Sequence, residues 1–175
     1  GMIGHLYSKK LGRFLRALEF NGDENFTVAT AVGSSVFGLF YFGAFPAADE
    51  KVRNTMRAIE EKLWINTEIG GVARFENDGY MRVSKELTGN PWFICTLWLA
   101  EYRIAVAESK DDLRGALEIL EWTVKRAQPS GVLAEQVNPL TGEPISVSPL
   151  TWSHSTFVAV VNNYLKKLSS ISEAD

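Results

Sequence analysis

Five side chains of this sequence could do chemistry, and they lie in or beside two long polar segments. Arg74 and Asp78 stand in the first segment, Glu135 stands in the second, and Trp92 and Trp152 follow shortly after each. A guanidinium presents a planar set of donors, a carboxylate accepts protons, and an indole offers a flat face. Each group also has an ordinary alternative. Glu135 could be solvated, Arg74 and Asp78 could pair and pin their loop, and both Trp side chains could pack in the core.

The composition leaves little room for a metal or nucleic-acid site. One Cys and two widely spaced His residues are too few for a zinc ligand set. Cys95 lies in an apolar run and is most simply a small core residue, while we expect His154 to hold a hydrogen bond. A net charge of −3 without a basic stripe makes nucleic acid a poor partner. We therefore expect no metal, no cofactor and no nucleic acid.

The chain length of 175 residues suits one domain, residues 1–175, with a real core. One uncharged stretch of 23 residues, Phe26–Ala48, is long enough to cross a membrane. Gly, Ser and Pro residues dilute this stretch, however, and a helix that is apolar on every side is also typical of a buried central helix. We therefore expect no membrane span and a cytoplasmic location.

Hydrophobic periodicity predicts six helices. Three are amphipathic, and they cover Tyr7–Phe20, Ala48–Leu63 and Asp111–Gln128. Three are apolar on nearly every side, and they cover Thr27–Phe42, Pro91–Ala107 and Thr151–Leu168. The two kinds alternate, and a ring of outer helices around inner helices satisfies both burial patterns. The sequence therefore predicts an all-α fold of the α/α-toroid type with about three helical hairpins.

Loop lengths single out one end of this ring. Connections from an apolar helix to the next amphipathic helix are short, at about residues 43–47 and 108–110. Two connections in the opposite direction, Trp64–Asn90 and Pro129–Leu150, are long. All outer-to-inner connections emerge at the same end of such a ring, and long ordered loops are usually functional. We expect the site on that face.

The two long loops carry linked motifs. The first reads Gly70-Gly71-Val72-Ala73-Arg74-Phe75-Glu76-Asn77-Asp78-Gly79-Tyr80 and leads into Gly89-Asn90-Pro91-Trp92-Phe93. The second contains Glu135-Gln136 and leads into Leu150-Thr151-Trp152-Ser153. In this order they resemble the C-terminal signatures of glycoside hydrolase family 15, which includes glucoamylases, glucodextranases and some trehalases. The resemblance covers roughly Asp49 to Leu168, and in the first 45 residues it rests on the helix pattern alone.

The resemblance implies an inverting hydrolase of α-glucosidic bonds, built on a six-hairpin (α/α)6 barrel. It puts Glu135 at the position of the general base and Arg74 at an arginine that binds glucose hydroxyls. It also suggests Asp78, Trp92 and Trp152 as substrate-binding residues. Inversion needs a general acid about 6.5–9.5 Å from the base. No segment matches the family's acid motif, and three hairpins are half a barrel, so we expect the isolated chain to be incomplete and inactive.

Three hypotheses about function stay open at this stage. The chain could carry half of a site for an α-glucoside oligosaccharide or trehalose, completed by a partner chain or by a homodimer. It could instead be a non-catalytic carbohydrate-binding protein that retains Arg74 and the aromatic residues. It could also be a helical fragment that oligomerises through exposed inner helices.

Overall fold

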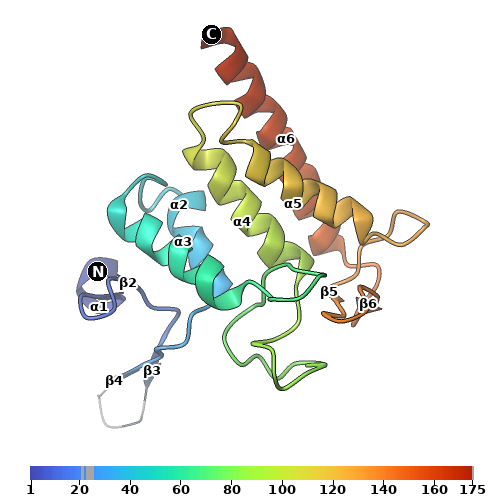
Figure 1. Ribbon diagram of the computed structural model, residues 1–175. Helices are drawn as coiled ribbons and strands as arrows, with labels where there is room; N and C mark the ends of the chain where they lie inside the picture. Colours follow the sequence, from blue (N-terminus) through green and yellow to red (C-terminus); the bar gives the residue numbers. More distant parts are fainter. Residues whose placement is uncertain (21, 23–25, 175) are drawn as a thin grey trace.

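Helices form the larger part of the fold in the computed structural model, which describes residues 1–20, 22 and 26–174 (Figure 1). The long helices are α3 (Glu50–Leu63), α4 (Phe93–Val106), α5 (Arg114–Lys125) and α6 (Thr151–Ala174). Shorter turns are α1 (Met2–His5), the 3-10 helix η1 (Ser34–Phe37) and α2 (Gly38–Tyr41). The predicted helical architecture is confirmed. Of the six predicted helices, the first is wrong and the second is correct only in its last part.

The strands are short and pair locally in antiparallel fashion. Strand β1 (Tyr7–Ser8) pairs with β2 (Arg13–Phe14), and β3 (Leu18–Phe20) pairs with β4 (Phe26–Val28). Strand β5 (Gln136–Val137) pairs with β6 (Pro144–Ile145) inside the second long loop. Pairs of two or three residues add little stability of their own, so these strands depend on the helices that they contact.

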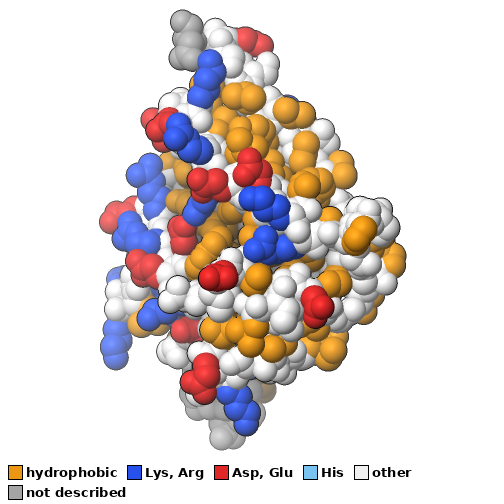
Figure 2. Space-filling model, turned by 45° about the vertical axis from the view of Figure 1, so that its right-hand side comes forward, with side chains coloured by type: hydrophobic (Ala, Val, Ile, Leu, Met, Phe, Trp, Pro, Cys, Tyr) orange, Lys and Arg blue, Asp and Glu red, His pale blue; other side chains and the backbone are white. Residues whose placement is uncertain are grey.

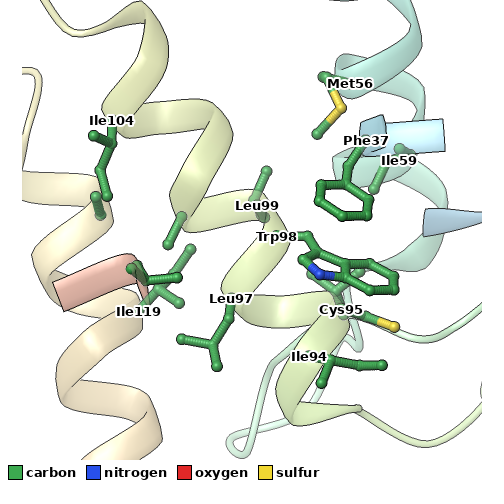
Figure 3. Packing of buried hydrophobic residues seen from close by; sticks show 14 of the residues in the cluster. Phe37, Met56, Ile59, Ile94, Cys95, Leu97, Trp98, Leu99, Ile104 and Ile119 are labelled. Atoms are coloured by element: carbon green, nitrogen blue, oxygen red, sulfur yellow. The ribbon is translucent and has the colours of Figure 1, made fainter. Parts of the chain in front are cut away.

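Helix α4 is the central element and packs against both α5 and α6. Every residue from Phe93 to Glu101 is buried, because neighbours cover the helix on all sides. On one side the rings of Phe37 and Trp98 stack at 4.1 Å with 7° between their planes. Figure 3 shows these rings beside Met56 of α3, with Ile119 of α5 on the opposite side of α4. The apolar run around residues 93–101 therefore forms an inner helix, as predicted.

Helices α3 and α5 are outer helices, each covered along one face. The buried residues of α3 are Val52, Thr55, Met56, Ile59 and Leu63, spaced by three or four. This spacing keeps them on one side of a helix. At its start, the Asp49 carboxylate accepts a hydrogen bond of 2.8 Å from the Lys51 amide. That cap satisfies a donor that the first turn would otherwise leave open.

The predicted helix over Tyr7–Phe20 is wrong, because this segment forms β1, β2 and β3 instead. Gly12 has a φ of +66°, which turns the chain between the first two strands. The Phe14 amide then donates to the Thr55 hydroxyl of α3 at 2.9 Å. The Leu11, Leu15 and Leu18 spacing suggested a helix, but local hairpin pairing and the contact with α3 decide the conformation here.

The predicted helix over Thr27–Phe42 is correct only in its last part. Residues 26–28 form β4, and helical turns begin at Ser34 and run through η1 and α2. Between them the chain is extended and pairs with the first long loop. The Val32 amide donates to Glu76 Oε2 at 2.7 Å, and the Ser34 amide donates to the Arg74 carbonyl at 2.9 Å. These contacts satisfy donors that a helix would use internally.

The inner layer therefore consists of η1 with α2, α4 and α6, and the outer layer consists of α3 and α5. This is part of an α/α barrel. Among the described residues, none of the helices combines the length and apolar character that a membrane crossing needs.

Candidate active site

The two long loops meet at the end of the fold where the inner helices begin. Antiparallel bridges join Gly33 to Phe75, Ala73 to Pro91, Trp92 to Gln136 and Gln136 to Ile145. Extended segments from distant parts of the chain therefore lie side by side, below α4 in Figure 1. Gly33 and Trp92 are also the residues that cap η1 and α4. We call this set of bridged segments the loop platform.

Arg74 and Asp78 form a bidentate ion pair on the platform. Arg74 Nε donates to Asp78 Oδ2 and Nη2 donates to Oδ1, each at 2.8 Å. The Asp78 carboxylate also accepts the Tyr80 amide at 3.0 Å. The hydrogen bonds that Arg74 donates to Asp78 raise the pKa of Arg74 above its ordinary value. Asp78 is 2% exposed and the Arg74 side chain is 37% exposed, so the pair offers its guanidinium to a ligand.

Aromatic rings surround the Arg74 guanidinium. Its central carbon lies 4.6 Å from the centre of the Trp92 ring, 4.9 Å from that of Phe75 and 5.5 Å from that of Tyr80. Such contacts attract the cation to the ring faces and restrict its position. Trp92 itself is only 4% exposed. The guanidinium is thus fixed by one carboxylate and three rings.

Glu135 is held by the β5–β6 hairpin. The Ser146 hydroxyl donates to Glu135 Oε2 at 2.5 Å, and Gln136 Nε2 lies 3.4 Å from the same oxygen. The Tyr80 hydroxyl lies 3.3 Å from Ser146 Oγ. Tyr80 therefore contacts both Arg74 and the hydroxyl that holds Glu135, and it connects the two predicted site residues.

Ser146 has a φ of +67°, a conformation that non-glycine residues seldom adopt. Such conformations cost free energy and persist where the surrounding structure enforces them, often at functional sites. Here the enforcing contacts are the β5–β6 pairing on one side and the Glu135 backbone on the other, whose amide donates to the Val147 carbonyl at 2.9 Å.

A buried pair of amide side chains ties the first long loop to the second. Asn90 Nδ2 donates to Gln136 Oε1 at 2.8 Å and also to the Met81 carbonyl at 2.9 Å. The Val83 amide donates back to Asn90 Oδ1 at 3.1 Å. Both side chains are buried, and buried polar groups that satisfy each other fix a single arrangement. This pair therefore joins the segment that leads to Trp92 to the segment that carries Glu135.

Trp152 occupies a neighbouring hollow of about 440 Å³ between η1, α2, α4 and α6. It is 54% exposed, and its ring lies 5.7 Å from that of Trp98 at 59°. Tyr41 and Glu101 line the same hollow. Burial raises the pKa of Glu101 above its ordinary value, against a smaller lowering by the hydrogen bonds from Asn163.

The structure thus brings Arg74, Asp78 and Trp92 into direct contact and links Glu135 to them through Tyr80 and Ser146. Three connecting residues, Tyr80, Asn90 and Gln136, stand within the sequence motifs but were not predicted as site residues. Nothing in the sequence marks Ser146, because its contact with Glu135 depends on how the β5–β6 hairpin folds back.

The remaining candidates for chemistry have structural partners. His154 Nε2 accepts the Leu133 amide at 3.0 Å, which confirms the hydrogen-bonded role predicted for it. Cys95 is fully buried beside the Ser34 hydroxyl, and burial raises the pKa of its thiol to about 12. Within residues 1–20, 22 and 26–174, no group of His, Cys, Asp and Glu side chains is arranged to hold a metal ion.

The chain is thus a partial α/α barrel whose loop face presents a carboxylate, a fixed arginine and aromatic rings. The chain belongs to glycosyl hydrolases family 15, whose sequence model matches residues 34–162. This match covers the loop platform, α3 to α5 and the first half of α6.

Individual relatives agree with this assignment. An uncharacterized glycosyl hydrolase of Methanocaldococcus jannaschii is 32% identical over 74% of this chain and 21% of its own length. A glucoamylase of a Clostridium species is 29% identical over 78% of this chain and 21% of its own length. Trehalase 2 of Sulfolobus acidocaldarius is 29% identical over 79% of this chain and 21% of its own. The chain therefore spans about one fifth of the length of these relatives.

Solved structures show the same fold. A bacterial glucoamylase complexed with acarbose superposes with a TM-score of 0.69 at 28% identity, over 82% of this chain and 22% of that chain. A structure described as wild-type glycosidase superposes with a TM-score of 0.70 at 22% identity, over 93% of this chain and 41% of that chain. The second likeness concerns the fold alone.

Proposed function

We propose that this chain is the C-terminal part of the catalytic barrel of an inverting α-glucosidase, in which Glu135 is the general base. The observation that supports this most directly is the fixed position of the Glu135 carboxylate, held by Ser146 at 2.5 Å on the platform that carries the Arg74–Asp78 pair. In this proposal Glu135 takes a proton from the water that attacks the anomeric carbon. In this proposal residues 1–175 are a single domain that forms part of the barrel.

The substrate-binding roles divide by exposure. Arg74, with more than a third of its side chain exposed, donates to sugar hydroxyls through the atoms that Asp78 leaves free. Trp152, exposed by more than half, stacks against a sugar ring. Asp78 and Trp92 are nearly buried against Arg74, so in this proposal they bind substrate by holding that guanidinium in place.

The substrate is an α-glucoside oligosaccharide or trehalose. Relatives at 29% identity are a glucoamylase and a trehalase, and a glucoamylase at 28% identity was solved with acarbose. These names support the α-glucosidic bond as the target. We call Arg74 and the residues that hold it, Asp78, Phe75, Tyr80 and Trp92, the Arg74 cluster. In this proposal the cluster recognises one glucose unit, and the rest of the barrel selects the group that is bonded to that glucose.

The general acid belongs to another part of the barrel in this proposal. Glu76 and Glu143 are the other carboxylates of the site-side loops with room for such a role. Glu76 accepts a hydrogen bond from the Val32 amide, and Glu143 is exposed and contacts Thr141. Neither is held in place by the Arg74 cluster, so in this proposal the acid comes from a partner chain or from a longer form of this chain.

The test is turnover in a barrel completed with the remaining hairpins, with Glu135→Gln as the variant. We expect turnover to fall by about 10²–10⁴-fold, because the amide keeps the size and hydrogen bonds of Glu135 but takes no proton from water. Glucose affinity, measured by isothermal titration, should change little. Ser146→Ala leaves the carboxylate but removes its 2.5 Å partner. Its turnover should lie between that of the wild type and that of Glu135→Gln. Full turnover in Glu135→Gln would assign the base to another residue.

A further inference from the structure

A second hollow surface lies beside the loop platform, between α3, α5 and the loop that follows α3. Figure 1 shows this loop leaving the end of α3 toward α5. Two adjoining hollows of about 590 and 400 Å³ share Trp64 and Arg103 as lining residues. Both volumes lie within the range of about 300–1,000 Å³ that small ligands usually occupy. We call the two hollows together the Trp64 groove.

Trp64 forms the centre of this groove. It ends α3 and is 38% exposed, although an indole usually lies more deeply buried. Its ring packs against Gly70, where an added Cβ would lie 3.0 Å from Trp64 Cζ2. Gly70 also has a φ of +66°, a conformation that suits glycine. The backbone therefore supports one part of the indole and leaves the rest open to both hollows.

Arg103 forms a fixed polar floor between the hollows. Its guanidinium donates to the Gly115 carbonyl at 2.9 Å and pairs with Glu60. An added Cβ on Gly115 would lie 2.8 Å from Arg103 Nη1, so the two are closely fitted. About a quarter of the Arg103 side chain stays exposed. A planar donor group in a set position costs little further ordering when a ligand binds.

The loop wall of the groove is also held in place. The Trp122 indole N–H and Arg126 Nη2 both donate to the Ile69 carbonyl, at 2.7 and 2.8 Å. The Arg126 guanidinium lies 5.1 Å from the centre of the Trp122 ring. Residues 67–70 are therefore pinned to α5, and the groove exists before any ligand binds.

The charges of the groove favour a neutral, hydroxyl-rich ligand. Its carboxylates are Glu60, Glu61, Glu68, Glu118 and Glu121, and its cations are Arg57, Arg103, Lys125 and Arg126. The slight excess of carboxylates disfavours phosphate and nucleic acid. A sugar chain both donates and accepts hydrogen bonds, so it can pair with both kinds of charged group, and its rings can stack on an indole.

We propose that the Trp64 groove is a second carbohydrate-binding site, separate from the loop platform, which takes a segment of an α-glucan chain through Trp64 and Arg103. The choice of an α-glucan rests on the function proposed above, whereas the groove itself does not. A site there would hold a long glucan beside the barrel while the Arg74 cluster binds its end. The groove is lined by residues of α3, α4, α5 and the loop after α3.

The test is native gel electrophoresis of the chain with amylopectin in the gel, compared with a plain gel and a gel that contains a β-glucan. We expect retention by amylopectin alone. Trp64→Ala should weaken the affinity about tenfold, in the range found when a central aromatic contact is truncated. Trp64→Phe, which keeps a ring and disturbs the fold less, should retain part of it. Circular dichroism checks that each variant is folded.

Trp152→Ala is the matched control, because it removes an exposed indole from the proposed active site and leaves the groove intact. Retention that survives Trp152→Ala and is lost in Trp64→Ala supports the groove. Retention that is lost only in Trp152→Ala overturns the groove and leaves the proposed active site standing. A wild-type chain that runs equally in plain and amylopectin gels also overturns the groove, while the Glu135→Gln test of turnover remains independent of that result.

Discussion

At the scale of single residues, the site is a set of side chains that hold one another. Arg74 is fixed by a bidentate carboxylate and by Trp92, while Glu135 is fixed by one hydroxyl. Tyr80 touches both halves. Fixed geometry of this kind lets a charged group act without reorganising when substrate binds. The fixed positions of Arg74 and Glu135 on the loop platform therefore favour the chemistry that we propose.

Asp78→Asn tests how much the ion pair stabilises this region. The change keeps the shape of the side chain but removes its charge, and one amide nitrogen then faces the guanidinium. Because Asp78 is buried and Arg74 is partly exposed, we expect a loss of about 1–3 kcal/mol in the free energy of unfolding. Urea denaturation measures it.

The matched control is Asp111→Asn, since Asp111 and Arg114 also form an ion pair but are 81% and 72% exposed. We expect that control to change the free energy of unfolding by less than about 0.5 kcal/mol. Equal losses in the two variants would show that the Arg74–Asp78 pair has no special structural role.

At the scale of elements, the helices that could be predicted are those whose burial pattern is local. In α3, the apolar spacing of three and four survives in the structure as the buried face. In α5, the apolar stripe predicted the helix but only partly its buried face, because Leu120 is buried whereas Leu117 and Val124 are exposed. The predicted bounds of the fourth helix differ from α4 by two residues at the start and one at the end. The last helix runs to Ala174, six residues beyond its predicted end, and Ile171 in this extension packs in the core.

What could not be predicted depends on contacts between distant residues. The hairpins in residues 7–28 pair within themselves and dock on α3 through the bond from Phe14 to Thr55. The extended segment before Ser34 bonds to the first long loop. Periodicity carries no information about such partners. For the site, the motifs predicted Arg74, Asp78 and Glu135. The contact of Ser146 with Glu135 could not be predicted, because it forms only when β6 pairs with β5.

Gly71→Ala tests how the first long loop is joined to α5. Gly71 has a φ of +93°, and an added Cβ would lie 2.7 Å from both Pro91 Cβ and Trp122 Cζ2. We expect a loss of about 2–4 kcal/mol in the free energy of unfolding from backbone strain and overpacking together. Thermal unfolding followed by circular dichroism, together with urea denaturation, measures it.

Gly79→Ala serves as the control in the same loop, because an added Cβ there meets nothing within 4 Å. We expect it to change the free energy of unfolding by less than about 0.5 kcal/mol. If Gly71→Ala proved as mild as this control, the close approach of the loop to Trp122 would not matter for stability.

At the scale of the whole molecule, the partial barrel leaves apolar side chains open along α5 and α6. Leu117, Val124, Val158 and Leu165 are 40%, 62%, 57% and 55% exposed. Figure 2 shows hydrophobic side chains gathered in its upper right part, while charged side chains gather mainly at the left. Soluble monomers seldom expose large contiguous apolar patches. We infer that this face is an interface.

Self-association is the outcome that we expect for the chain by itself, most simply as a two-fold dimer. Sedimentation velocity across micromolar concentrations should show a concentration-dependent shift toward a larger species. Val158→Asp and Leu165→Asp should each move the equilibrium toward monomer, because a charge would be buried in the interface. Ser170→Asp, at an exposed position on a different side of α6, is the control. A wild-type chain that sediments as a monomer at all concentrations contradicts this expectation.

The last prediction concerns catalysis by the isolated chain. We expect the isolated chain not to hydrolyse α-glucosides. The departing oxygen needs a proton, and a positioned general acid contributes about 10²–10⁴-fold. In the proposed site that acid faces Glu135 across the sugar, about 6.5–9.5 Å away. Of the other glutamates on the same loops, Glu76 accepts the Val32 amide, and Glu68, Glu86 and Glu143 are exposed.

A dimer does not remove this requirement, because a second Glu135 supplies another base in the same environment as the first. One of the two would have to be buried differently before it could hold a proton at neutral pH. The assay is glucose release from maltose, isomaltose and trehalose by the purified chain, and Glu135→Gln reveals any contaminating enzyme. Robust release that disappears in Glu135→Gln would mean that these 175 residues contain their own acid, and that the catalytic unit of this family can be smaller than half a barrel.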